Sequence, residues 1–202
     1  MIVYVETNFL LELALGQQEL QAATALLDLA EQRAFTLAIP SFCFSEAFAT
    51  LAERERSRRN LRSNLSEHIR QLKRSEPLQN AAAALEPLLQ FLQGLEQDEF
   101  GRLQSAVGRV LASAQMVELT SEVFLDALNA EDQFGLSPQD AIIYASVLKH
   151  LRGQPAAESK IFASLNWKDF RDPGLIEQLH TYGCRYEESF HAALARVRSE
   201  SA

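Results

Sequence analysis

Four acidic residues from separate segments of the chain are the strongest candidates for chemistry. Glu6 directly follows an apolar run at residues 2–5, and Glu46 lies in a later apolar stretch. Asp140 stands at the start of a helical pattern, and Asp169 follows another short apolar run. Carboxylates that gather in one cleft repel one another unless a cation lies between them. Oxygen ligands suit Mg²⁺ or Mn²⁺, so this set of acids indicates a divalent-metal site.

Short β-rich runs alternating with helical patterns must position these acids. The expected strands are residues 2–5, 35–39, 117–119, 160–163 and 183–186, and the expected helices include 19–33, the segment after residue 120 and the tail from about 188. Strands that alternate with helices predict βαβ units and a parallel sheet. Ligands of such sheets gather at the carboxyl ends of the strands, where Glu6 and residues 164–169 would lie.

Two helix starts help to place the acids. Ser137 is the expected N-cap of a helix that has Pro138 in its first position and Asp140 in its third. Thr7 is the expected N-cap of the first helix. Structural alternatives stay open here, because Asp140 could serve only as a favourable charge at a helix start, and Asp169 could only cap or turn the chain.

The middle of the chain is helical from about residue 41 to 114, and Pro77 and Pro87 divide it into two or three helices. Although the net charge is −8, the segment 54–74 has eight cations and two acids. The cations are Arg54, Arg56, Arg58, Arg59, Arg62, Arg70, Lys73 and Arg74. This basic stretch is either a solvated helix face, a contact for RNA phosphates or a docking site for an acidic protein.

The cysteines, the N-terminal residues and the lengths of the apolar runs indicate the compartment in which the protein occurs. Cys43 and Cys184 each lie in apolar surroundings far from one another, which excludes a disulfide framework and favours a reducing compartment such as the cytoplasm. The N-terminal residues contain charges and no basic leader, so they read as structure and not as a signal peptide. No apolar run is long enough to span a membrane.

The acidic segments, taken together, resemble those of the PIN-domain family. The segment Val5–Glu12 resembles the opening strand and turn of the family, and Ser45–Glu46 resembles its helical glutamate. Leu136–Ala141 resembles the third acidic motif, and Phe162–Phe170 resembles the closing strand and turn. These matches occur in the expected order and cover roughly a quarter of the chain.

The resemblance implies a three-layer α/β/α sandwich with a short parallel sheet, here a single domain over residues 1–202 with a helical insertion at about 51–115. It implies a ribonuclease that uses Mg²⁺ or Mn²⁺ held by Glu6, Glu46, Asp140 and Asp169, the same residues being catalytic. Thr7, Asn8, Ser164 and Asn166 would support this site. The family also implies RNA as substrate, the toxin role of a toxin/antitoxin pair with an antitoxin as partner, and a homodimer.

Two positions depart from the family pattern and motivate an alternative. Glu6 stands where the family usually has Asp, and Asn166 occupies a position where the family often has an acid. A scaffold with weakened catalysis that binds RNA or protein is therefore the second hypothesis. A third is a helical adaptor, because the middle block would offer an extended surface of its own.

Overall fold

Five strands form one parallel sheet in the order β3-β2-β1-β4-β5 in the computed structural model. The structure describes residues 1–200, apart from the side chains of residues 96 and 97. The strands are β1 (Ile2–Val5), β2 (Thr36–Pro40), β3 (Gln115–Val117), β4 (Lys160–Ala163) and β5 (Cys184–Glu187). All five predicted strands are confirmed, with bounds that differ by at most about two residues.

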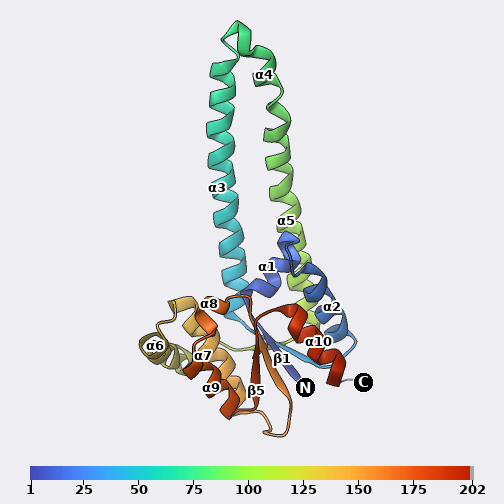
Figure 1. Ribbon diagram of the computed structural model, residues 1–202, viewed down its shortest axis with the longest axis vertical. Coiled ribbons are helices and arrows are strands. Elements are labelled where there is room, and N and C mark those ends of the chain that lie inside the picture. The colour runs from blue at the N-terminus through green and yellow to red at the C-terminus, as the bar shows by residue number, and fades with distance from the viewer. Residues whose placement is uncertain (201–202) are drawn as a thin grey trace.

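Helices cover both faces of the sheet, which confirms the expected α/β/α arrangement (Figure 1). They are α1 (Thr7–Leu15), α2 (Leu20–Glu31), α3 (Phe42–Leu72), the 3₁₀ turn η1 (Glu76–Leu78), α4 (Gln79–Ala83), α5 (Glu86–Ser113), α6 (Ser121–Phe134), α7 (Pro138–Arg152), α8 (Trp167–Phe170), α9 (Pro173–Thr181) and α10 (Phe190–Glu200). In Figure 1, α2 and α10 lie on one side of the sheet and α7 and α9 on the other.

The central strands β1 and β4 are buried along their whole length. Strands of a parallel sheet that helices cover on both faces are mostly apolar, which explains the sequence IVYV and the IFA of KIFA. The buried Lys160 at the start of β4 is compensated by backbone carbonyls, since its ammonium donates to those of Pro155, Glu158 and Tyr182. Their last residues, Val5 and Ala163, are partners in the register. The strand order reverses between these two strands, so Glu6 and Ser164 both leave the sheet at its switch point.

Helices α3 and α5 form an antiparallel hairpin that projects from the sheet, with η1 and α4 at its far end (Figure 1). With 31 residues, α3 is about 46 Å long. The part of α5 nearest the sheet is held by Arg102, whose Nε donates to the Ala14 carbonyl at 2.6 Å, and by Arg109, which pairs with Asp28 at 2.6 Å. The insertion was expected to begin at about residue 51, but the helix that contains Glu46 continues into the hairpin without a break.

Both cysteines are buried as free thiols, in agreement with the expected absence of a disulfide framework. Among the described residues, no helix is long and apolar enough to cross a membrane.

Candidate active site

Glu6 lies at the carboxyl end of β1 and is the N-cap of α1. Its Oε2 accepts a hydrogen bond from the Asn8 backbone N–H at 2.8 Å, and its Oε1 accepts one from the Ser164 hydroxyl at 3.2 Å. The prediction of Thr7 as N-cap is therefore wrong: α1 already begins at Thr7, and Glu6 before it supplies the capping oxygen. Only 3% of Glu6 is exposed, and this burial raises the pKa of its carboxyl to about 7 despite the hydrogen bonds it accepts.

Glu46 lies in the second turn of α3 and faces the start of α1. The hydroxyl of Thr7, which was expected to cap α1, instead donates a hydrogen bond to Glu46 Oε2. Burial raises the pKa of Glu46, the Thr7 hydrogen bond lowers it, and the charge of Asp140 raises it again. Asp140 is thus close enough to Glu46 for its charge to disfavour ionisation of the Glu46 carboxyl.

Asp140 lies in the first turn of α7, where the predicted helix start is confirmed. The Ser137 hydroxyl accepts from the Asp140 backbone N–H at 3.2 Å and donates to Asp140 Oδ2 at 2.5 Å. Asn166 comes from the other side and donates from Nδ2 to Asp140 Oδ1 at 2.9 Å. Both oxygens of this half-buried carboxylate therefore have a neutral donor.

A chain of hydrogen bonds joins these segments. The Ser164 hydroxyl, which donates to Glu6, accepts from the Asn166 backbone N–H at 3.0 Å, and the Asn166 amide continues to Asp140. Glu46 closes the group through its electrostatic contact with Asp140. The fold therefore brings three of the four acids together, and each of the four supporting residues, Thr7, Asn8, Ser164 and Asn166, donates to one of them.

The structure does not bring Asp169 into this group. Asp169 lies on α8 and lines a separate pocket beside Trp167. Its side chain makes no hydrogen bond or ion pair with any residue that the structure describes.

A groove of about 550 Å³ leads from the acids along α3. The groove is lined by Glu46, Arg54 and Gln139, among others. Arg54, which was predicted to contact RNA, therefore shares a cavity with the acid Glu46. Gln139 was not predicted from the sequence as a site residue, although it precedes the candidate acid Asp140 in the first turn of α7.

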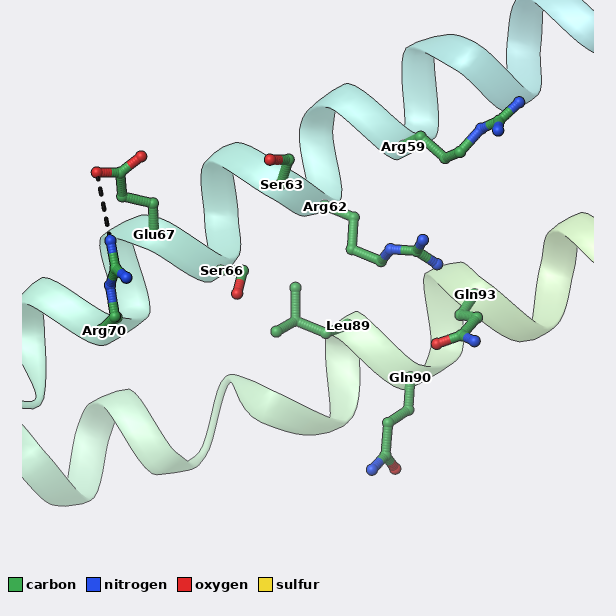
Figure 2. Close-up of a pocket in the computed structure, with 9 residues that line it drawn as sticks. All are labelled: Arg59, Arg62, Ser63, Ser66, Glu67, Arg70, Leu89, Gln90 and Gln93. Atoms are coloured by element: carbon green, nitrogen blue, oxygen red, sulfur yellow. Dashed lines mark ion pairs between the residues drawn. The ribbon is translucent and has the colours of Figure 1, made fainter.

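Most of the basic stretch is matched by carboxylates of the hairpin itself. The pairs are Arg56–Glu53, Arg58–Glu99, Arg59–Glu55, Arg70–Glu67 and Lys73–Glu86. Figure 2 shows Arg59, Arg62 and Arg70 around a polar pocket of about 530 Å³ between α3 and α5, with the Arg70–Glu67 pair at its end. The local excess of positive charge that the sequence suggests is therefore smaller on the folded hairpin.

The chemistry of the donor set fits Mg²⁺ or Mn²⁺, because every candidate ligand atom is a carboxylate, hydroxyl or amide oxygen. Within residues 1–200, however, no group of three or more His, Cys, Asp or Glu side chains is gathered closely enough to hold a metal ion. Glu46 and Asp140 are half-buried and accessible to an ion from solvent, whereas Glu6 is buried. A pair of carboxylates with waters is a usual arrangement for Mg²⁺.

Two comparisons with known proteins gave matches. The family model described as "PIN domain" matches residues 3–170. Among solved structures, the chain is similar to that of "VapBC2 from Rickettsia felis bound to a DNA fragment from their promoter", with a TM-score of 0.45 and 14% sequence identity over 93% of this chain and 99% of that chain. No curated protein matches the chain.

Proposed function

We propose, from the premise that this chain belongs to the PIN domain family, that it is a divalent-metal-dependent endoribonuclease that hydrolyses RNA phosphodiester bonds. The observation that carries the proposal is the hydrogen-bond network at the switch point of the sheet, in which Ser164 and Asn166 link Glu6 to Asp140 and Thr7 donates to Glu46. The mutual repulsion of Glu46 and Asp140 is what a bound cation would relieve.

The three acids differ in solvent exposure, and we assign them different roles in metal binding for that reason. Glu46 and Asp140 would hold the cation, and Glu6 would supply a third negative charge from its buried position behind them. The bound ion would polarise the phosphodiester and lower the pKa of an attacking water. Thr7 and Ser137 orient the two accessible carboxylates, since each hydroxyl donates to one of them. Asp169 lies outside this group, so its part in metal binding is the least supported of the four.

RNA would approach along the groove that Glu46 shares with Arg54. Arg54 makes no ion pair with any described residue, so its guanidinium is available for a phosphate next to the cleaved bond. The paired cations on the hairpin are exposed, and exposed ion pairs exchange partners at little cost in free energy. They would therefore add contacts to longer RNA.

Cleavage of RNA by the purified chain, with and without a chelator, tests the proposal. Asp140→Asn keeps the size of the side chain but removes its charge, and we expect it to lower cleavage by at least about 100-fold. Asp132→Asn on α6 is the matched control, because Asp132 is exposed and outside the site. Metal-independent cleavage, or equal activity of the Asp140 and Asp132 variants, would contradict the proposal.

A scaffold with weakened catalysis is the second candidate, and one observation favours it. The Asn166 amide already occupies an oxygen of Asp140, at a position where the resemblance leads one to expect an acid. A thermal-unfolding titration with Mn²⁺ separates the two candidates. Stabilisation that disappears in Asp140→Asn supports the nuclease, whereas the scaffold predicts no stabilisation in either protein.

We also propose a protein partner. Large apolar side chains are exposed along the hairpin, among them Leu61, Leu88 and Phe91, which are 43–60% exposed. Surfaces of this kind mark contacts with other proteins. The toxin role with an antitoxin and the homodimer follow from the family resemblance. Co-expression with the neighbouring gene product and the mass of the purified protein in solution test these two partners.

A further inference from the structure

A pocket of about 340 Å³ lies between the segment that precedes Ser137 and the segment that follows Asn166, and it has no role in the function proposed so far. One wall is the junction between α6 and α7, with Phe134 and Leu136, and the other is α8, with Trp167, Lys168 and Asp169. This cavity is called the Trp167 pocket below. It is distinct from the groove that Glu46 and Arg54 line.

Both walls of the Trp167 pocket are continuous with residues that hold Asp140. Trp167 directly follows Asn166, which donates to Asp140 Oδ1 at 2.9 Å. Leu136 directly precedes Ser137, which donates to Asp140 Oδ2 at 2.5 Å. The groove of Arg54 is lined by Gln139, which directly precedes Asp140 in the chain. Each cavity is therefore lined by a residue next to Asp140 or next to one of its hydrogen-bond partners, and a strand bound at Asp140 would reach both.

Trp167 is not needed to pack the turn that contains it. Phe170 of the same helix is completely buried and packs against Phe162 with ring centroids 5.1 Å apart. Trp167 is 47% exposed, so a large aromatic surface faces solvent next to the proposed site of cleavage. Exposed indole rings are stacking platforms for unpaired nucleobases.

The polar groups of the pocket suit a nucleotide. The Lys168 ammonium lies 5.9 Å from the centre of the Trp167 ring and has no carboxylate partner among the described residues. The Asp169 carboxylate is also without a hydrogen bond or ion pair there. The remaining charges are engaged, since Arg171 pairs with Glu188 at 3.0 Å and Asp172 accepts from the backbone at the start of α9.

We propose that the Trp167 pocket is a nucleobase subsite for a single-stranded RNA substrate. An unpaired base next to the cleaved bond stacks on Trp167, Lys168 contacts the neighbouring phosphate, and Asp169 accepts a hydrogen bond from an amino group of the base. Adenine, guanine and cytosine have such an amino group and uracil does not. The inference rests on the proposed ribonuclease function, and it specifies an RNA that is unpaired at the cut.

The chain contains one tryptophan, so fluorescence excited selectively at tryptophan reports on this pocket alone. We would titrate the metal-free protein with a short single-stranded RNA and with an abasic oligonucleotide of the same length and charge. The proposal predicts that the RNA quenches the fluorescence and that the abasic strand, at the same occupancy, does not. Equal quenching by both strands, or quenching by neither, would overturn it.

Variants extend the test to affinity and cleavage. Trp167→Ala should weaken binding of the short RNA by about tenfold, and Trp167→Phe should keep most of the affinity, because stacking is the interaction removed. Phe124→Ala is the matched control, since Phe124 on α6 is 48% exposed and lines neither the Trp167 pocket nor the groove of Arg54. Asp169→Asn should reduce the preference for amino-bearing bases over uracil in the same binding assay. Equal losses in the alanine variants at 167 and 124 would contradict the subsite.

The outcomes also separate this inference from the function on which it rests. Base-dependent quenching without metal-dependent cleavage would leave the subsite standing and remove the nuclease. Cleavage that continues in Trp167→Ala with unchanged KM, and that treats paired and unpaired RNA alike, would remove the subsite and keep the nuclease.

Discussion

Glu6 has a structural role and a proposed chemical role in the same side chain. It caps α1 through the Asn8 N–H and accepts the Ser164 hydroxyl, while its burial disfavours the charged form. A carboxylate that ends a buried strand is costly unless donors or a cation compensate its charge. The hydrogen bonds compensate in part, and a bound cation would compensate the rest.

The raised pKa of Glu6 predicts a pH dependence of folding stability in the metal-free protein. Its pKa rises from 4.5 to about 7 on folding, so between these values the folded protein binds a proton that the unfolded chain has lost. The stabilisation by this proton is therefore complete when the pH is below the pKa of Glu6 in the unfolded chain. It is lost as the pH rises toward the pKa of Glu6 in the folded protein. We expect a loss of about 3 kcal/mol in this window.

Denaturant unfolding of the parent protein and of Glu6→Gln at both ends of this window measures the effect. The glutamine variant cannot ionise, so its stability should change less between the two pH values. Parallel pH profiles of the two proteins would be inconsistent with a raised pKa at Glu6.

Thr7 provides a second prediction at the residue scale. Its hydroxyl donates to Glu46 Oε2, and Thr7→Val replaces that hydroxyl with a methyl group of similar size. Loss of such an orienting hydrogen bond should weaken Mn²⁺ binding by about tenfold. Mn²⁺-dependent shifts in the melting temperature report the affinity. Thr36→Val, at the exposed start of β2, is the control, and equal affinities in the two variants would oppose the orienting role.

At the scale of elements, a buried ion pair connects the two helices of the hairpin between an apolar region near the sheet and another near the tip. Arg58 on α3 and Glu99 on α5 form two hydrogen bonds of 2.5 and 2.9 Å, with side chains 20% and 8% exposed. Apolar contacts continue toward the sheet with Leu51 and Leu103 and toward the tip with Leu65 and Ile69. A paired charge between apolar layers fixes the register of two helices, because any sliding would leave it unpaired.

Breaking this pair should therefore destabilise the hairpin. Glu99→Ala would leave Arg58 without its carboxylate, at a cost of about 3–5 kcal/mol, whereas Arg58→Met combined with Glu99→Leu should recover most of the loss. Hydrogen exchange of the α3 and α5 amides measures the change. Arg56→Met breaks an exposed pair and should cost less than about 1 kcal/mol. Equal protection in the Glu99 and Arg56 variants would show that the Arg58–Glu99 pair does not hold the hairpin.

At the scale of the whole molecule, the acids and the hairpin tip are far apart. Glu46 and Ile69 lie on one continuous helix, about 35 Å apart along its axis. In Figure 1, α4 lies at the end of the hairpin that is farthest from the sheet. Changes to the sequence of the distal hairpin should therefore leave the structure of the site unaltered.

Replacing residues 61–95 with a short glycine-containing turn tests this independence. The truncated chain keeps Leu51, Leu103 and the Arg58–Glu99 pair, so it should fold and cleave short single-stranded RNA with unchanged kcat/KM. Binding of longer RNA should weaken and lose part of its salt dependence, because cations are removed. A folded truncation that no longer cleaves short RNA would place the distal hairpin in the active site.

The sequence by itself determined the strands, the start of α7 and the chain order of the acids, because short-range patterns of apolar residues and caps specify them. It also singled out Thr7, Asn8, Ser164 and Asn166, through their likeness to a family pattern. The tertiary structure decided that Glu6, and not Thr7, caps α1, because Ser164 from a distant segment donates to Glu6 while the Thr7 hydroxyl donates to Glu46 on α3.

Long-range placement decided the rest. Asp169 and Asn166 are three residues apart, yet the start of α8 directs Asn166 to Asp140 and Asp169 to the Trp167 pocket. The carboxylates that match the basic stretch come partly from α5, so the charge of the hairpin depends on the pairing of two helices. Contacts between segments far apart in the chain depend on the strand order, and no local pattern in the sequence contains that information.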